Sequence, residues 1–407
     1  IGWILPNDGY GCGYGQTNSL DDDIEELKQF VDYANAHGLE VGLWTQSNLW
    51  PKDPNNPQKG ERDIRKEVEK AGVRAVKTDV AWVGAGYSMA LDGVMKAYDA
   101  ITELGKSKPA IVSLNGWGGT QRYAGIWSGD QSGGNWEYIR FHIPTYLGTG
   151  LSGMPYVGSD MDGIFGGKNP VIQTRDFQWK AFTPYMLDMD GWGSSQKNPW
   201  EFGEPNTSIN RAYLKLKAEM MPYVATASKY SSETGVPMVR AMLFEEMNDF
   251  TLGKETQYQF MWGDDVLVAP VYKNTKMDDE GNDVRNNIYL PGTSDVWIDY
   301  LTGEHYRGGR VLNDFDAPIW KTPVFVRNGA IIPLYAENNN PRPISKNNPK
   351  GLDKSIRRAE VFPFESSEFE VYEDDGITFE GSGMRTLYTS VVNGDKATIT
   401  LGKPKGS

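Results

Sequence analysis

Residues 73–79 read Val73-Arg-Ala-Val-Lys-Thr-Asp79, a short apolar run that ends in a lysine and an aspartate. A helical pattern over residues 61–71 precedes it, and the run itself predicts a buried strand over 73–76. The same alternation extends outward on both sides. Strands are also predicted over residues 1–5, 39–44, 109–114, 125–127, 151–157 and 182–187, and helices over 18–37, 88–104, 136–146 and 208–230. Such alternation indicates parallel strands joined by crossover helices.

The number and spacing of these strands decide between two α/β architectures. Seven strands at this spacing fit a TIM-type (β/α)8 barrel that lacks its first strand better than an open, doubly wound sheet. After residue 235 the pattern changes to short apolar strands separated by Gly, Pro, Asn and Asp, which is typical of β-sandwiches. We therefore predict a barrel over residues 1–234, a proximal β-sandwich over 235–336 and a distal, incomplete β domain over 337–407.

The composition of the 407 residues excludes several classes of function. A formal net charge of −13 disfavours binding to nucleic acids and anionic membranes, and no apolar run approaches the roughly 20 residues that span a bilayer. The single cysteine, Cys12, excludes an internal disulfide framework, and three histidines leave little for a zinc site. No Gly-rich phosphate loop follows a predicted strand, so we expect neither metal nor cofactor. Abundant carboxylates and aromatic residues indicate carboxylate chemistry on a neutral, polar ligand.

Catalytic groups in an α/β barrel project from the carboxyl ends of the strands. The polar or aromatic residues at these ends are Asp8, Trp44, Gln46, Lys77, Asp79, Asn115, Asp130 and Asp160. We therefore expect four aspartates to converge on one face of the barrel, and two of these stand out by their sequence context.

Asp79 and Asp130 are predicted to divide the chemistry between them. Lys77 lies two residues before Asp79, on the same face of its strand, and a cation there keeps a buried carboxylate ionised, as a nucleophile requires. Asp130 follows Trp127, and an apolar, aromatic surround favours the protonated form that a general acid needs. A carboxylate nucleophile and a carboxyl general acid are the two groups that a glycosidase needs at minimum in order to retain anomeric configuration.

A structural role is the alternative for each of these residues. An aspartate at a strand end more often caps a helix or binds a loop, and capping is a serious rival for Asp130, which precedes the helix predicted over 136–146. The same applies to the tryptophans that could serve as sugar platforms, because tryptophan more often belongs to a core. The candidates are Trp117, Trp127, Trp136, Trp192 and Trp200.

At these residues the sequence resembles glycoside hydrolase family 31, the α-glucosidase and α-glucosyltransferase family. The Lys77-Thr-Asp79 segment resembles the family's nucleophile motif, and Gln121-Arg-Tyr-Ala-Gly-Ile-Trp-Ser-Gly-Asp130 resembles its acid/base motif. The match continues, in order, over nearly the whole chain through residues 150–165, Arg175, Gln178, 182–184, 222–223, 236–240, 258–270 and 372–376. The resemblance implies that Asp79 is the nucleophile and Asp130 the acid/base, and that Asp160 contacts the sugar in subsite −1.

The resemblance also predicts the substrate class and which domains of the family fold this chain lacks. It implies an N-terminal β-sandwich and a first barrel strand that this chain lacks. Many members carry Arg where this chain has Leu114-Asn115. They also carry an Arg-Asn-His sequence at the last strand, where this chain has Leu187-Asp-Met-Asp190, so that Met189 replaces the His. Simple exo-α-glucosidase specificity is therefore in doubt. The sequences of residues 136–146, 158–163 and 189–192 resemble those of the cycloalternan and isomaltosyltransferase branch of the family.

We therefore expect a metal-free, retaining enzyme that transfers or hydrolyses α-glucosyl or isomaltosyl units of α-1,3/α-1,6-linked glucans such as cycloalternan. Its partner is an oligosaccharide or α-glucan, and its location is secreted or at the cell surface. The alternatives are an ordinary exo-α-glucosidase or α-xylosidase and, more remotely, a non-catalytic glucan-binding protein. The residues expected to bind substrate are Asp8, Trp44, Lys77, Asn115, Trp127 and Asp160.

Overall fold

A computed structural model describes most of the chain. The described residues are 2–6, 17–45, 49–79, 87–114, 116–191, 194–338, 342–344 and 348–406, without the side chains of 87–90. In this part of the chain, no helix has both the length and the apolar character needed to cross a membrane.

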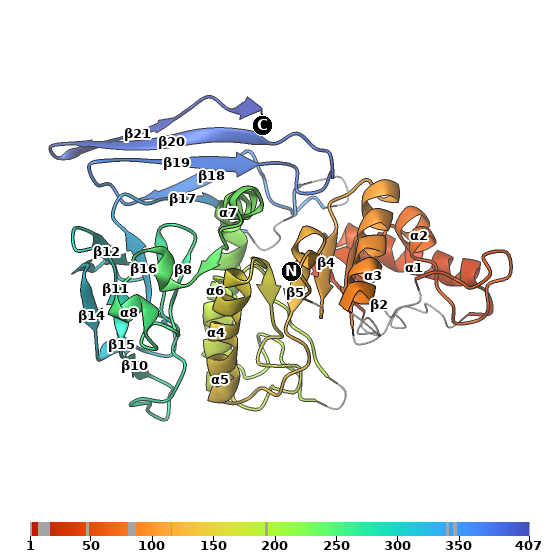
Figure 1. Ribbon diagram of the computed structural model, residues 1–407, viewed down its shortest axis with the longest axis horizontal. Helices are drawn as coiled ribbons and strands as arrows, with labels where there is room; N and C mark the ends of the chain where they lie inside the picture. Colours follow the sequence, from red (N-terminus) through yellow and green to blue (C-terminus); the bar gives the residue numbers. More distant parts are fainter. Residues whose placement is uncertain are drawn as a thin grey trace.

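The first half of the chain builds a parallel sheet in which the strands follow one another in sequence order (Figure 1). Its strands are β1 (Trp3–Ile4), β2 (Glu40–Thr45), β3 (Ala75–Thr78), β4 (Ala110–Ser113), β5 (Gly125–Trp127) and β6 (Val157–Gly158). Each pairs in parallel with the next, and a further parallel bridge joins Asp160 to Leu187. Sequential parallel order is the order of a (β/α)8 barrel, so the predicted fold class is confirmed.

The helices of the first half are α1 (Leu20–Ala36), α2 (Ile64–Lys66) with η2 (Glu67–Ala71), α3 (Tyr87–Asp99) with η4 (Ala100–Leu104), η5 (Thr120–Arg122), α4 (Trp136–Leu151), α5 (Pro170–Lys180), α6 (Asn206–Glu219) and α7 (Met221–Thr234). Helices α1, α3 and α4 pack against the parallel sheet, whereas α6 and α7 contact strands of the second half. Helix α1 shows why such segments fold: the Ser19 side chain caps its first turn, acids follow, and its apolar stripe is buried against β2.

Two predicted strands are wrong, each for a local reason. Residues 151–157 were expected to be extended, but α4 continues to Leu151 and only Val157 and the residue after it form β6. Residues 182–187 form no regular strand. The Thr183 hydroxyl bonds the Lys180 carbonyl at 2.7 Å, and Pro184 has no N–H for a ladder, so only the bridge at Leu187 remains.

The second half of the chain is built from short antiparallel strands. A six-stranded sheet has the order β13-β12-β16-β9-β8-β7, and two-stranded ribbons flank it. The elements are β7 (Val239–Arg240), η6 (Met242–Phe244), α8 (Asp249–Leu252), β8 (Phe260–Trp262), β9 (Val266–Val268), β10 (Asp283–Arg285), β11 (Ile288–Leu290), β12 (Val296–Asp299), β13 (His305–Arg307), β14 (Arg310–Leu312), β15 (Phe315–Ala317) and β16 (Val324–Arg327). The last are β17 (Ile331–Tyr335), β18 (Arg357–Val361), β19 (Ser366–Glu373), β20 (Met384–Asn393), β21 (Lys396–Leu401) and β22 (Lys405–Gly406). Strands β19 to β22 make a further sheet beside α7 (Figure 1).

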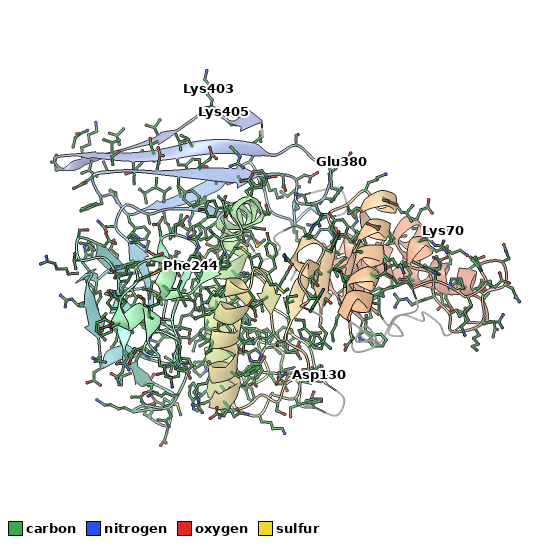
Figure 2. The ribbon with its side chains drawn as sticks, in the orientation of Figure 1. Lys70, Asp130, Phe244, Glu380, Lys403 and Lys405 are labelled. Carbon is green, nitrogen blue, oxygen red and sulfur yellow. The ribbon has the colours of Figure 1, made fainter. Side chains whose placement is uncertain are left out.

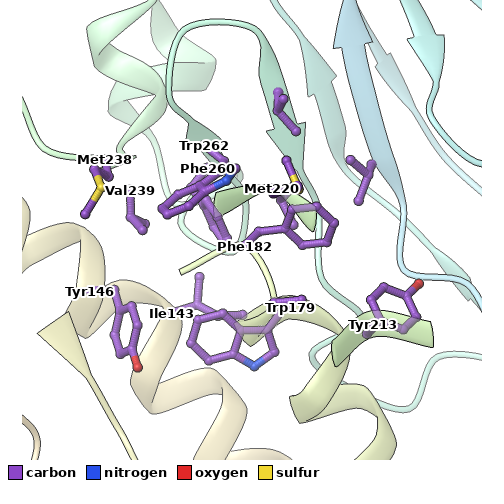
Figure 3. Packing of buried hydrophobic residues seen from close by; sticks show 14 of the residues in the cluster. Ile143, Tyr146, Trp179, Phe182, Tyr213, Met220, Met238, Val239, Phe260 and Trp262 are labelled. Atoms are coloured by element: carbon purple, nitrogen blue, oxygen red, sulfur yellow. The ribbon is translucent and has the colours of Figure 1, made fainter. Parts of the chain in front are cut away.

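Helices α4, α5 and α6 lie between the parallel sheet and the β sheets of the second half (Figure 1). One apolar core joins these parts. Figure 3 shows Trp179 and Phe182, from α5 and the turn after it, beside Phe260 and Trp262 of β8. The barrel helices and the proximal sheet therefore exclude water from a common interface, which fixes α5 in place.

Candidate active site

The carboxyl ends of β2, β3, β5 and β6 lie at one edge of the parallel sheet. The register places Trp44 opposite Lys77 across β2 and β3, and Trp127 opposite Gly158 across β5 and β6. Because side chains alternate along a strand, Lys77 and Asp79 project from the same face. Of the residues predicted to converge at the strand ends, the structure brings together Asp79, Lys77, Trp44 and Asp160. Trp127 joins them through Lys77 and Asp160.

Asp79 lies one residue past β3 and is almost fully buried, with an exposed fraction of 9%. Two donors meet its Oδ2 atom: the indole Nε1 of Trp44 at 2.9 Å and the ammonium Nζ of Lys77 at 3.1 Å. A buried carboxylate needs such partners, since desolvation alone would penalise its charge. Lys77 itself is 1% exposed, so the pair forms a desolvated ionic contact at the strand end.

Lys77 also connects Asp79 to the other side of the site. Its Nζ lies 3.9 Å from the centroid of the Trp127 ring, within the range of a cation–π interaction. The indole Nε1 of Trp127 in turn donates to Asp160 Oδ1 at 3.0 Å. A continuous chain of contacts therefore runs from Trp44 through Asp79, Lys77 and Trp127 to Asp160.

Asp160 is buried with an exposed fraction of 1%. Burial raises the pKa of its carboxyl group to about 7, against the opposing effects of Lys77, the Trp127 N–H, Lys180 and Lys197. Its Oδ2 atom is buried and has no hydrogen-bond partner among the described residues. An unsatisfied buried oxygen beside the Asp79 group is a position at which a ligand hydroxyl could donate a hydrogen bond.

The backbone of Asp160 is held by a second polar cluster that the sequence analysis did not identify. Lys180 Nζ donates to the Asp160 carbonyl at 2.7 Å and pairs with Asp176 at 2.6 Å, and both side chains are fully buried. Asp176 also accepts the N–H of Asp162 at 2.7 Å. No predicted helix covered these residues, because every residue of α5 from Ile172 to Lys180 is buried, polar ones included, and no amphipathic stripe results. The family resemblance included Arg175 and Gln178 of this helix but neither Asp176 nor Lys180.

Asp130 lies on the loop after β5 and its side chain is exposed, in contrast to the apolar, aromatic surround that the sequence predicted. The physical reason is the turn of the chain at Gly129, which has φ +82°. Trp127, which was expected to lie beside Asp130, points inward instead and contacts Lys77 and Asp160. Figure 2 shows Asp130 at the lower edge of the molecule, beyond the β5 end of the sheet.

The remaining predicted site residues divide into two groups. Asp8, Gln46, Asn115 and Trp192 lie outside the described residues. Of the candidate sugar platforms, Trp117 and Trp200 are exposed, whereas Trp136 packs against the main core and Trp127 is 1% exposed. Trp127 therefore acts through its buried contacts rather than as an open stacking surface. Among the residues that the structure describes, no three His, Cys, Asp or Glu side chains gather as metal ligands.

Comparison with protein families identifies two matching domains. The TIM-barrel domain of glycosyl hydrolases family 31 matches residues 22–227, and the C-terminal domain of the same family matches residues 235–332.

Two curated relatives align over most of the chain. A probable glucan 1,3-alpha-glucosidase of Arabidopsis thaliana is 33% identical over 376 residues, which is 91% of this chain and 38% of the relative. An alpha-xylosidase of Saccharolobus solfataricus is 30% identical over 336 residues, or 80% of this chain and 43% of the relative. The chain thus spans less than half the length of these curated relatives.

Solved structures confirm the fold. A family 31 dextranase of Flavobacterium johnsoniae superposes with a TM-score of 0.79 at 22% identity, covering 99% of this chain and 57% of that one. The cycloalternan-forming enzyme of Listeria monocytogenes gives a TM-score of 0.68 at 20% identity, covering 90% of this chain and 40% of that one.

The raised pKa of Asp160 predicts a pH-dependent stability. Its pKa is about 7 in the folded protein and near the ordinary 3.8 in the unfolded chain. Between these values the folded state holds a proton that the unfolded state has released, so this group's contribution to stability falls as pH rises from about 4 to 7. The variant Asp160→Asn lacks this dependence. We expect the free energy of unfolding of the natural protein, relative to Asp160→Asn, to fall by about 2–4 kcal/mol between pH 4 and pH 8.

Urea titrations of both proteins across this pH range measure the difference. Parallel stability curves for the two proteins would show that Asp160 titrates normally and would contradict its assigned environment.

Proposed function

This chain belongs to glycosyl hydrolase family 31, and from that premise we propose that it carries the catalytic centre of a retaining α-glycosidase. The observation that carries the proposal is the setting of Asp79. Its carboxylate lies at the end of a barrel strand, almost fully buried, with Lys77 Nζ at 3.1 Å and Trp44 Nε1 at 2.9 Å from one oxygen. Both partners stabilise negative charge on Asp79, which is the state in which a carboxylate attacks.

In the proposed first step Asp79 is the nucleophile and Asp130 the general acid. An Asp79 oxygen forms a bond to the anomeric carbon while the bond from that carbon to the leaving oxygen breaks. The proton of the Asp130 carboxyl group passes to the leaving oxygen, which departs as a neutral hydroxyl. The product is a covalent glycosyl-enzyme with inverted configuration at the anomeric carbon.

In the second step Asp130, now a carboxylate, accepts a proton from water or from a sugar hydroxyl. The oxygen so activated attacks the anomeric carbon and releases Asp79, which restores the original configuration. The exposure of Asp130 supports this role, because the acid/base must meet both the leaving group and the incoming acceptor. Asp160 supports it in another way: its unpartnered buried oxygen suits a hydroxyl of the bound sugar.

The proposed substrates are α-1,3/α-1,6-linked glucans, with glucosyl or isomaltosyl units transferred or hydrolysed. The two positions that depart from the family pattern are Leu114-Asn115 and Met189. Asn115 lies outside the described residues, and the side chains of Leu114 and Met189 pack against the cluster around Trp127. The apolar side chains of Leu114 and Met189 supply no hydrogen bonds to individual hydroxyls of a terminal glucose. This supports a site that draws binding energy from a longer glycosyl unit rather than from one tightly held sugar.

The names of the curated relatives favour two related alternatives. The Arabidopsis relative is a probable glucan 1,3-alpha-glucosidase, which supports cleavage of α-1,3 bonds, and the Saccharolobus relative is an alpha-xylosidase. The remaining alternative is a non-catalytic glucan-binding protein. The ionic contact between Lys77 and Asp79 argues against this alternative, because carbohydrate binding alone does not need a buried carboxylate.

Replacing either proposed catalytic aspartate should abolish turnover. We expect Asp79→Ala and Asp130→Ala to lower kcat on an α-glucan oligosaccharide on the order of 10⁴-fold, because each removes a group that acts in the transition state. Added azide separates the two roles. With an α-glycosyl fluoride it should give the β-glycosyl azide with Asp79→Ala and the α-glycosyl azide with Asp130→Ala.

An exposed helix aspartate gives a matched control. Among the described residues Asp92 forms its ion pair across its own helix turn, with Lys96, and Asp92→Ala should keep full activity. Near-normal turnover by Asp79→Ala, with the fold verified by circular dichroism, would refute the assignment of the nucleophile.

Product analysis decides the substrate class. Incubation with isomaltose, nigerose, panose and a cyclic α-1,3/α-1,6 tetrasaccharide should give longer oligosaccharides, or isomaltose from the cycle. The variant Met189→His should shift kcat/KM about tenfold in favour of terminal α-glucosides, because it adds a donor where the natural chain is apolar. Glucose as the sole product would favour the exo-α-glucosidase, and release of xylose from an α-xyloside would favour the α-xylosidase.

A further inference from the structure

The loop that carries Asp130 connects β5 to α4 and comprises residues 128–135, Ser-Gly-Asp-Gln-Ser-Gly-Gly-Asn. Three of its residues are glycines, and Gly129 and Gly134 adopt positive φ angles of 82° and 72°. Glycine restricts the backbone least, so a loop of this composition does not by itself define where a side chain lies. Two side chains outside the loop hold it, one near each end.

The first anchor is His142, in the second turn of α4. Its Nδ1 lies 2.9 Å from the carbonyl oxygen of Tyr138, and its Nε2 lies 2.9 Å from Ser128 Oγ. A carbonyl can only accept, so Nδ1 carries the proton, and the neutral ring then presents Nε2 as an acceptor. The hydroxyl of Ser128 must therefore donate to His142, which fixes its rotation.

The neutral ring is maintained by its surroundings. His142 is fully buried, and burial together with Lys180 lowers its pKa to about 3. The ring packs on Tyr138 with centroids 4.2 Å apart. The hydroxyl of Tyr138 donates to the Asp160 carbonyl, so the helix bearing His142 is itself tied to the site.

The second anchor is Asp162, which follows Asp160 by two residues. Its Oδ1 accepts the N–H of Gly134 at 2.7 Å, and its Oδ2 accepts the N–H of Gly167 at 2.8 Å. The contact is close, because a Cβ added to Gly133 would lie 1.5 Å from the Asp162 carbonyl oxygen. Asp162 itself has φ +52°, a strained conformation for a residue with a side chain.

We propose that His142, through Ser128, and Asp162, through Gly134, are positioning residues that set the place of the Asp130 carboxyl group. The inference rests on the proposed function, in which Asp130 is the acid/base. Proton transfer requires hydrogen-bond distance to the leaving oxygen, and a displacement of about 1 Å costs on the order of 10²-fold in rate. Two anchors on a glycine-rich loop restrict that displacement without touching the substrate.

The experiment compares substrates that differ in their need for an acid. A disaccharide leaving group has a high pKa and must be protonated, whereas fluoride departs with little help. For Ser128→Ala and His142→Gln we expect kcat/KM on the disaccharide to fall about 10- to 100-fold, and kcat/KM on the α-glycosyl fluoride to fall less than about threefold. Asp162→Asn, which removes one of two acceptor oxygens, should give the same pattern.

Two further variants serve as controls. At the C-cap of α1, His37 Nδ1 lies 2.8 Å from the Tyr33 carbonyl, and the two ring centroids lie 4.3 Å apart. This is the same local arrangement as His142 on Tyr138, but His37 is exposed. His37→Gln should leave both rates unchanged. Ser128→Thr keeps the hydroxyl and should restore most of the activity lost in Ser128→Ala.

The outcomes separate this inference from the proposed function. Asp130→Ala is the reference, and it should lose activity mainly on the disaccharide. Suppose that Asp130→Ala behaves in this way but the anchor variants lose activity equally on both substrates or on neither. The anchors then do not position the acid, and the inference fails while the proposed role of Asp130 stands. If Asp130→Ala itself loses activity equally on both substrates, Asp130 is not the acid, and both the role of Asp130 and the inference fail.

Discussion

The arrangement of the site depends on one buried cation. Lys77 is almost completely removed from water, and its ammonium group is stabilised by the Asp79 carboxylate on one side and the Trp127 ring on the other. A buried ammonium without such partners would be strongly destabilising, so Asp79 and Trp127 must take the positions they have. Trp127 then directs its N–H to Asp160. The contacts of a single lysine thus align residues from three strand ends.

Helix α5 connects this site to the rest of the molecule. Toward the barrel, Lys180 and Asp176 hold the backbone at Asp160 and Asp162. Toward the β sheets, Arg175 donates to the carbonyl oxygens of Lys321, Ala317 and Gly281. The proximal sheet therefore supports the site from behind, which gives a physical reason for a barrel and a β domain that share one core.

The sequence predicted the parts of the fold that follow from local pattern. The strand ends carrying Lys77, Asp79 and Trp127 were found because buried parallel strands are short apolar runs and catalytic groups follow them. Helix α5 was missed because its polar residues are buried along with its apolar ones, so its sequence has no amphipathic period. His142 and Asp162 act through contacts between separate segments, which no spacing in one sequence reveals. The exposure of Asp130 likewise depends on the turn at Gly129.

The central claim is that Asp79 becomes covalently attached to the sugar. Incubation with a fluorinated glycosyl fluoride that forms the intermediate quickly and releases it slowly should trap this species, and peptide mass spectrometry then locates the label. The account predicts one sugar per protein, attached to the peptide that contains Asp79 and absent from Asp79→Ala. A label on any other carboxylate, or complete turnover of the reagent with an inverted product, would contradict it.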